Sequence, residues 1–192
     1  ALQAYGKAIS LNPNDKDIWN NLGEALQKVE KHNEALQCFE KALALQKDFE
    51  CAWHNKGFSL GKLRRDVDAV EAFDKALALN ARNEQSWNGK GASLHRMGKF
   101  EPAIECFDKA IHLKDEYVDA WNNKGASLAA LQRYEDASAC YDKILSLKPD
   151  VEAYNNRGLM LYSLKKYPDA IQSYTKALDL SMTYHVTWYN MG

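Results

Sequence analysis

The pentapeptide WNNKG, residues 121–125, recurs along the chain in edited form. The related strings are WNNLG, WHNKG, WNGKG, YNNRG and WYNMG, at residues 19–23, 53–57, 87–91, 154–158 and 188–192. Glycine inside a helix costs about 1 kcal/mol relative to alanine, and asparagine is also a weak helix former. A chain that repeats both residues at one place therefore uses them for something other than helix formation.

The spacing between these strings is almost constant. Successive aromatic residues lie 34, 34, 34, 33 and 34 positions apart, in the order Trp19, Trp53, Trp87, Trp121, Tyr154 and Trp188. A repeat of this length is typical of a solenoid, in which each unit packs against its neighbours.

Each repeat contains two stretches with apolar residues at helical spacing. In the repeat at 84–117 both stretches have intervals of three and four residues. They are Trp87, Gly91 and Leu94, and then Ala103, Phe107 and Ala110. Short polar turns join the stretches, so neighbouring helices run antiparallel. The sequence therefore predicts an all-α fold, an α-solenoid of antiparallel helix pairs.

Each repeat thus has an aromatic residue, a glycine four positions later, and then three residues in the second helix: an alanine, a phenylalanine or tyrosine, and usually a second alanine. This pattern resembles the tetratricopeptide repeat (TPR) family. The resemblance covers residues 1–192 as a single repeat domain and implies a right-handed superhelix. Full repeats are expected at 16–49, 50–83, 84–117, 118–150 and 151–184, with partial repeats at 1–15 and 185–192. Because the chain begins and ends inside repeats, we expect it to be a fragment of a longer protein.

In the family, the glycine lies where the two helices of a repeat cross most closely, and a side chain there would force them apart. Two features depart from the family pattern. The closing proline is present only at Pro13 and Pro149, so other second helices are expected to fray or extend. Basic residues replace a core leucine at Lys56, Lys90, Lys124 and Arg157. We expect them to bury their stems and extend their charges to water, with a functional basic stripe as the alternative.

Composition narrows the function classes. Lys and Arg total 25 against 26 Asp and Glu, and this balance disfavours nucleic acid as a partner. No run of about 18 apolar residues is present, so no membrane span is expected. The four cysteines lack the spacing of a zinc site or disulfide framework, and free thiols are typical of a cytoplasmic protein. With no catalytic motif either, we expect no enzyme activity, cofactor or metal.

By resemblance, the first helices line the inner, concave face. The residues that face this groove lie two before the aromatic and one, two, five, eight and nine after it. Nine of the twelve residues directly after the aromatics are asparagine. Carboxamides donate and accept hydrogen bonds, so a row of them binds the backbone of an extended peptide, as a similar ladder does in the superhelix of O-GlcNAc transferases. The predicted site is Asn20, Asn21, Asn55, Asn88, Asn122, Asn123, Asn155, Asn156 and Asn190, with apolar contacts at Phe58 and Leu159.

The expected partner is therefore a protein or peptide in the concave groove. A basic rim in the early repeats, at Lys28, Lys62 and Arg96, indicates a ligand that is acidic toward one end. A carboxylate clamp for chaperone tails is not expected, because lysine never follows the aromatic and arginine is never the residue after that.

Several alternatives stay open. The asparagines are common at this turn in the family, where they cap or solvate the helix start. The domain is alternatively a structural spacer, or a module that self-associates end to end through Tyr5 and Trp188. A further alternative is a substrate-recruiting appendage of an enzyme that lies outside this fragment.

Overall fold

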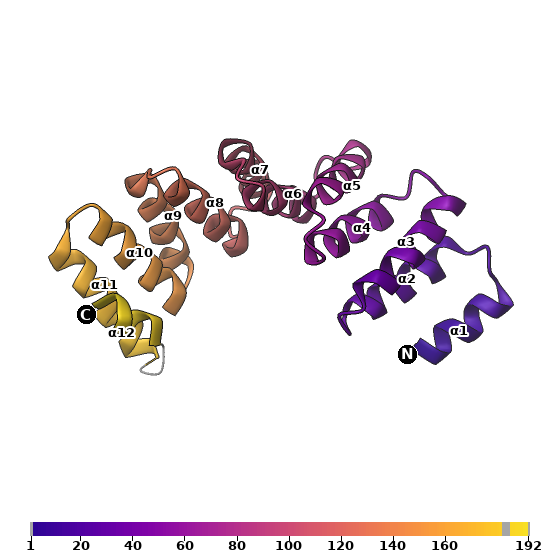
Figure 1. The fold of residues 1–192 in the computed structure, drawn as a ribbon, viewed down its shortest axis with the longest axis horizontal. Helices are drawn as coiled ribbons and strands as arrows, with labels where there is room; N and C mark the ends of the chain where they lie inside the picture. The colour runs from indigo at the N-terminus through magenta and orange to yellow at the C-terminus, as the bar shows by residue number, and fades with distance from the viewer. Residues whose placement is uncertain (1, 182–184, 192) are drawn as a thin grey trace. The chain divides into compact units, whose positions relative to one another are not determined.

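The computed structural model describes residues 2–181 and 185–191, which form twelve α-helices and no strands (Figure 1). The first helices of the repeats are α2 (Lys16–Gln27), α4 (Glu50–Lys62), α6 (Glu84–Arg96), α8 (Val118–Ala130), α10 (Val151–Ser163) and α12 (His185–Met191). The second helices are α1 (Leu2–Leu11), α3 (His32–Leu45), α5 (Asp66–Leu79), α7 (Phe100–Leu113), α9 (Tyr134–Leu147) and α11 (Tyr167–Leu180). The predicted all-α solenoid fold is confirmed. Gly192, which ends the last pentapeptide, lies outside the described residues.

The chain divides into two compact units, Ala1–Gly98 and Lys99–Gly192. In the first unit, α2 packs on α3 and α4 packs on α5. In the second unit, α8 packs on α9 and α10 packs on α11. The boundary falls between the two helices of the repeat at 84–117. No helix over residues 2–181 and 185–191 combines the length and apolar character needed to cross a membrane.

The pentapeptide glycines pack against the aromatic ring of the second helix. A Cβ atom on Gly23 would lie 2.4 Å from Cε1 of Phe39, and one on Gly158 would lie 2.5 Å from Cε1 of Tyr174. Both rings are buried. The close helix crossing expected from the sequence is therefore confirmed, and it explains why glycine is kept despite its low helix propensity.

Second helices end at an equivalent leucine whether or not a proline follows. Leu45, Leu79 and Leu113 end α3, α5 and α7 without a closing proline. The residue after each of these helices is extended. Trp53 Nε1 donates a hydrogen bond to the backbone carbonyl of Lys47 at 2.8 Å. Equivalent bonds of 2.8–2.9 Å join Trp19, Trp87 and Trp121 to the carbonyls of Pro13, Ala81 and Asp115. The expectation that these ends fray or extend is wrong, because the indole fixes the connection that follows.

The four basic residues on the first helices form a regular set of ion pairs. Each pairs with an acidic residue on the second helix of the preceding repeat. The pairs are Lys56–Glu40 (3.1 Å), Lys90–Asp74 (2.6 Å), Lys124–Asp108 (2.6 Å) and Arg157–Asp142 (2.5 Å). The basic side chains are 21–27% exposed, so their stems are largely buried as expected. Since these charges are already paired, the structure favours a packing role over a functional basic stripe.

Candidate functional site

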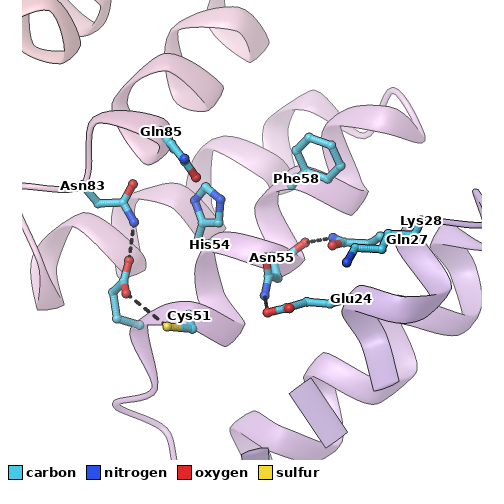
Figure 2. Close-up of a pocket in the computed structure, with 10 residues that line it drawn as sticks. Glu24, Gln27, Lys28, Cys51, His54, Asn55, Phe58, Asn83 and Gln85 are labelled. Atoms are coloured by element: carbon cyan, nitrogen blue, oxygen red, sulfur yellow. Dashed lines mark hydrogen bonds between the residues drawn. The ribbon is translucent and has the colours of Figure 1, made fainter. Parts of the chain in front are cut away.

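A hollow of about 570 Å³ lies on the first unit, between α2, α4 and the start of α6 (Figure 2). Eight of its ten lining residues occupy positions that the sequence predicts to face the groove. It brings together Asn55 and Phe58 of the predicted site. Glu50 and Asn83 were not predicted, because they precede those positions at the helix starts. Asn83 caps α6, and this Asn-before-helix pattern is the signal that would have found it.

The carboxamides in this part of the predicted ladder bind one another. Asn55 Nδ2 donates to Oδ1 of Asn20 at 3.1 Å and to Oε1 of Glu24 at 2.9 Å. Asn20 Nδ2 also donates to Oε1 of Glu24, at 2.8 Å, and Asn20 is only 5% exposed. Asn20, which directly follows Trp19, is therefore a contact between repeats.

The second unit contains the same arrangement. Oδ1 of Asn155 accepts hydrogen bonds from Nδ2 of Asn190 at 3.0 Å and from Oγ1 of Thr187 at 3.1 Å. Asn155 is 4% exposed. Asn20 and Asn155 are too buried to act as open ligand contacts, and their role in joining successive first helices is neither the ladder role nor helix capping.

The other predicted residues differ in exposure. Asn21 is exposed, and the side chains of five more asparagines are partly exposed, namely Asn88, Asn122, Asn123, Asn156 and Asn190. Phe58 on α4 is 43% exposed and Leu159 on α10 is 40% exposed. Both apolar side chains are therefore accessible, Phe58 in the hollow and Leu159 on the second unit.

Gly89 interrupts the row of asparagines for a structural reason. A Cβ atom at this position would lie 2.4 Å from Cζ of Phe73. The same ring lies against Gly57, where a Cβ would be 2.9 Å away. Because Phe73 packs against both α4 and α6, the third repeat has no room for an asparagine side chain at residue 89.

His54 occupies the position that holds asparagine in the other full repeats. Its Nδ1 lies 2.7 Å from Oγ of Ser86, and its ring centroid lies 5.8 Å from that of Phe73. Burial lowers the pKa of His54, and the carboxylates of Glu50, Glu24 and Glu84 oppose this shift. The imidazole is therefore neutral at pH 7 and adds no positive charge to the hollow.

This lowered pKa predicts a pH dependence of stability. The pKa of His54 in the folded state is lower than its unfolded value of 6.5, so the folded state binds the proton more weakly. The stability associated with neutral His54 is therefore present above pH 6.5 and is lost as the pH falls toward the folded-state pKa, by at most about 1.4 kcal/mol per pH unit. Thermal melts of wild type and His54→Asn between about pH 7.5 and about pH 5.5 measure this. The variant should show a flatter profile, and parallel profiles would contradict the prediction.

Cys51 is the exposed cysteine of the four, and it lies in the hollow. Burial raises the pKa of its thiol, and Glu50 and Glu24 raise it further. The thiol is therefore protonated and a weak nucleophile at neutral pH. Among the described residues, His, Cys, Asp and Glu side chains form no group of three suited to a metal ion. The arrangement is suited to binding through hydrogen bonds, charge and one exposed ring.

The stacked helix pairs define a helical-repeat protein. A tetratricopeptide repeat model matches residues 17–49, 84–117, 118–150 and 151–181, and a second TPR repeat model matches residues 1–29. The chain belongs to the tetratricopeptide repeat family. No curated protein matches its sequence.

Several solved structures share the fold. YrrB, described as a TPR protein with an unusual peptide-binding site, is 22% identical with a TM-score of 0.81, over 99% of this chain and 98% of YrrB. PilW, a type IV pilus biogenesis factor, is 18% identical with a TM-score of 0.88, over 99% of this chain and 89% of PilW. MamA is 21% identical with a TM-score of 0.79, over 85% of this chain and 90% of MamA. At these identities the likeness shows the fold alone.

Proposed function

We propose that this protein is an interaction scaffold that binds an extended segment of a partner protein across α2, α4 and the start of α6. The observation that carries the proposal is the hollow, which is lined by the exposed ring of Phe58 and by the amide groups of Gln27, Asn55, Asn83 and Gln85 (Figure 2). An apolar anchor with a few polar groups around it is typical of a ligand site. The peptide-binding site of YrrB, which has the same fold, supports the proposal.

The amides suit backbone recognition in a modified form of the predicted ladder. Both N–H groups of the Asn55 carboxamide are used within the protein, on Asn20 and Glu24. Its Oδ1 accepts no hydrogen bond from the described residues, so it is available to a peptide N–H. Its neighbours hold the Asn55 side chain in place, which lowers the entropy that binding would cost.

Loss of the exposed ring is expected to weaken peptide binding. Phe58→Ser removes the apolar anchor, and affinity for a peptide selected from a random dodecapeptide library should fall roughly tenfold, as expected for partial burial of one aromatic ring. Fluorescence anisotropy titration of the labelled peptide measures the change. Val67→Ser is the matched control, because Val67 is 68% exposed on α5 of the same unit and does not line the hollow. Equal affinity of wild type and Phe58→Ser would refute the proposed site.

End-to-end self-association is a second candidate, favoured by the exposed aromatic residues of α12. Trp188 is 52% exposed, whereas the equivalent Trp53 and Trp121 are partly buried, and Tyr189 is also exposed. Sedimentation equilibrium over a range of concentrations tests it. A mass that stays monomeric at every concentration would leave partner binding as the function.

A further inference from the structure

We infer that the hollow selects partner segments that carry an arginine, because oxygen atoms lining the hollow bind the arginine side chain. This inference rests on the proposed function and names the chemistry of its ligand. It comes from the hydrogen bonds already made around the hollow, which occupy the amide donors of Gln27 and Asn55 and leave their side-chain oxygens as acceptors.

The amide donors of two lining residues, Gln27 and Asn55, are occupied. Gln27 Nε2 donates to the backbone carbonyl of Asn55 at 2.8 Å and to Oγ of Ser59 at 2.9 Å. Asn55 Nδ2 likewise has two acceptors. Among the described residues, nothing donates to the side-chain oxygens of Gln27 and Asn55. Both amides therefore present acceptors to a ligand.

Two carboxylates add to this acceptor set. Oε1 of Glu24 accepts from Asn20 and Asn55, and Oε1 of Glu50 accepts from Asn83 at 2.6 Å. Within the described part of the chain neither carboxylate forms an ion pair, whereas Glu40 and Glu71 outside the hollow each pair with a lysine. Both act electrostatically on Cys51 and His54, so their charges converge on the same part of the hollow.

The basic residues expected to form a rim, Lys28, Lys62 and Arg96, form no ion pair with Glu24 or Glu50 in the described part of the chain. Lys28 lies beside Gln27 in Figure 2, away from Cys51 and Asn83. The ammonium of Lys62 lies 5.3 Å from the Phe58 ring centroid. Arg96 is held by Asp66, with 2.8 Å between Nε and Oδ1. The charge of the basic rim expected from the sequence is thus partly neutralised, because Arg96 is paired with Asp66. The acidic ligand that this rim indicated does not suit the part of the hollow that contains Glu24 and Glu50.

Arginine is the side chain that matches these groups. It carries five N–H donors in a planar fork, accepts nothing, and stays charged. Carboxylates and carbonyl oxygens at several directions satisfy such a fork better than the point charge of lysine. An apolar ligand residue next to the arginine would then cover Phe58.

The test uses peptides selected by the wild-type chain from a random dodecapeptide library. We expect arginine to be enriched in them. Replacing that arginine with citrulline, which is neutral and of the same shape, should weaken binding about tenfold, and Glu24→Gln or Glu50→Gln should each weaken it about threefold. In the double variant Glu24→Gln/Glu50→Gln, the citrulline peptide should bind as well as the arginine peptide, because the change in the protein and the change in the peptide remove the same interaction. Glu101→Gln/Glu105→Gln on α7 changes the net charge equally and should have no effect.

The outcomes separate this inference from the proposed function. Peptides without arginine, or citrulline peptides that bind wild type as tightly, would overturn the inference, while continued sensitivity to Phe58→Ser would uphold the binding site. Peptides that bind Phe58→Ser unchanged would overturn both. Bound arginine peptide should also slow alkylation of Cys51, since the other three cysteines are buried. Unchanged alkylation would place the peptide outside the hollow.

Discussion

Replacing Phe73 with alanine is expected to lower the free energy of unfolding of the first unit by about 3–5 kcal/mol, the usual loss for a buried phenylalanine. The ring is almost completely buried. It packs against Gly57 on α4 and Gly89 on α6, so one side chain from α5 contacts two first helices. The two glycines have no side chains to move into the cavity, and the site cannot collapse around it.

Urea denaturation followed by circular dichroism measures this loss. Phe58→Ala is the matched control, because it makes the same chemical change at an exposed ring and should cost much less. Amide hydrogen exchange assigns the loss to α4, α5 and α6. If Phe73→Ala lowered the free energy of unfolding no more than Phe58→Ala, the packing of the Phe73 ring against α4 and α6 would not stabilise the first unit.

Gly23→Ala is expected to destabilise the chain by about 2 kcal/mol, although alanine is the better helix former. The added Cβ would lie 2.4 Å from Cε1 and 2.6 Å from Cζ of Phe39. Phe39 is fully buried, so its ring cannot turn away without displacing α2 from α3. The cost of overpacking therefore exceeds the gain of about 1 kcal/mol in helix propensity.

Gly6→Ala provides the matched control on α1. Apart from its chain neighbours and the backbone of its own helix, nothing lies within 4 Å of a Cβ at Gly6, so the same substitution should stabilise the protein by up to about 1 kcal/mol. Thermal and urea unfolding of the two variants should thus shift in opposite directions. Stabilisation by Gly23→Ala would show that the close helix crossing is not what retains glycine.

The helices and their pairing were predictable because they follow from local periodicity. Trp87, Gly91 and Leu94 define one apolar face by their intervals alone, and the 34-residue spacing repeats it. The close approach at Gly23 was also predictable from the family pattern. The ends of α3, α5 and α7 were not, because the indole that fixes each connection bonds to a backbone carbonyl rather than to a recognisable side chain.

The candidate site was predictable only in part. The sequence placed Asn55 and Phe58 on the groove side of their helix, and they line the hollow. It did not indicate that Asn20 is buried, that Asn83 holds Glu50, or that Phe73 excludes a side chain at residue 89.

The amino-acid sequence by itself determined the repeat and the helix pairs, because these depend on intervals of three, four and 34 residues. Only the tertiary structure decided which amides are free to bind a ligand. Asn55 finds its partner Asn20 on the preceding repeat, 35 positions earlier, and Gln27 reaches Asn55 across the same interface. Hydrogen bonds between repeats depend on how the helices stack in space, and no periodicity within one helix specifies them.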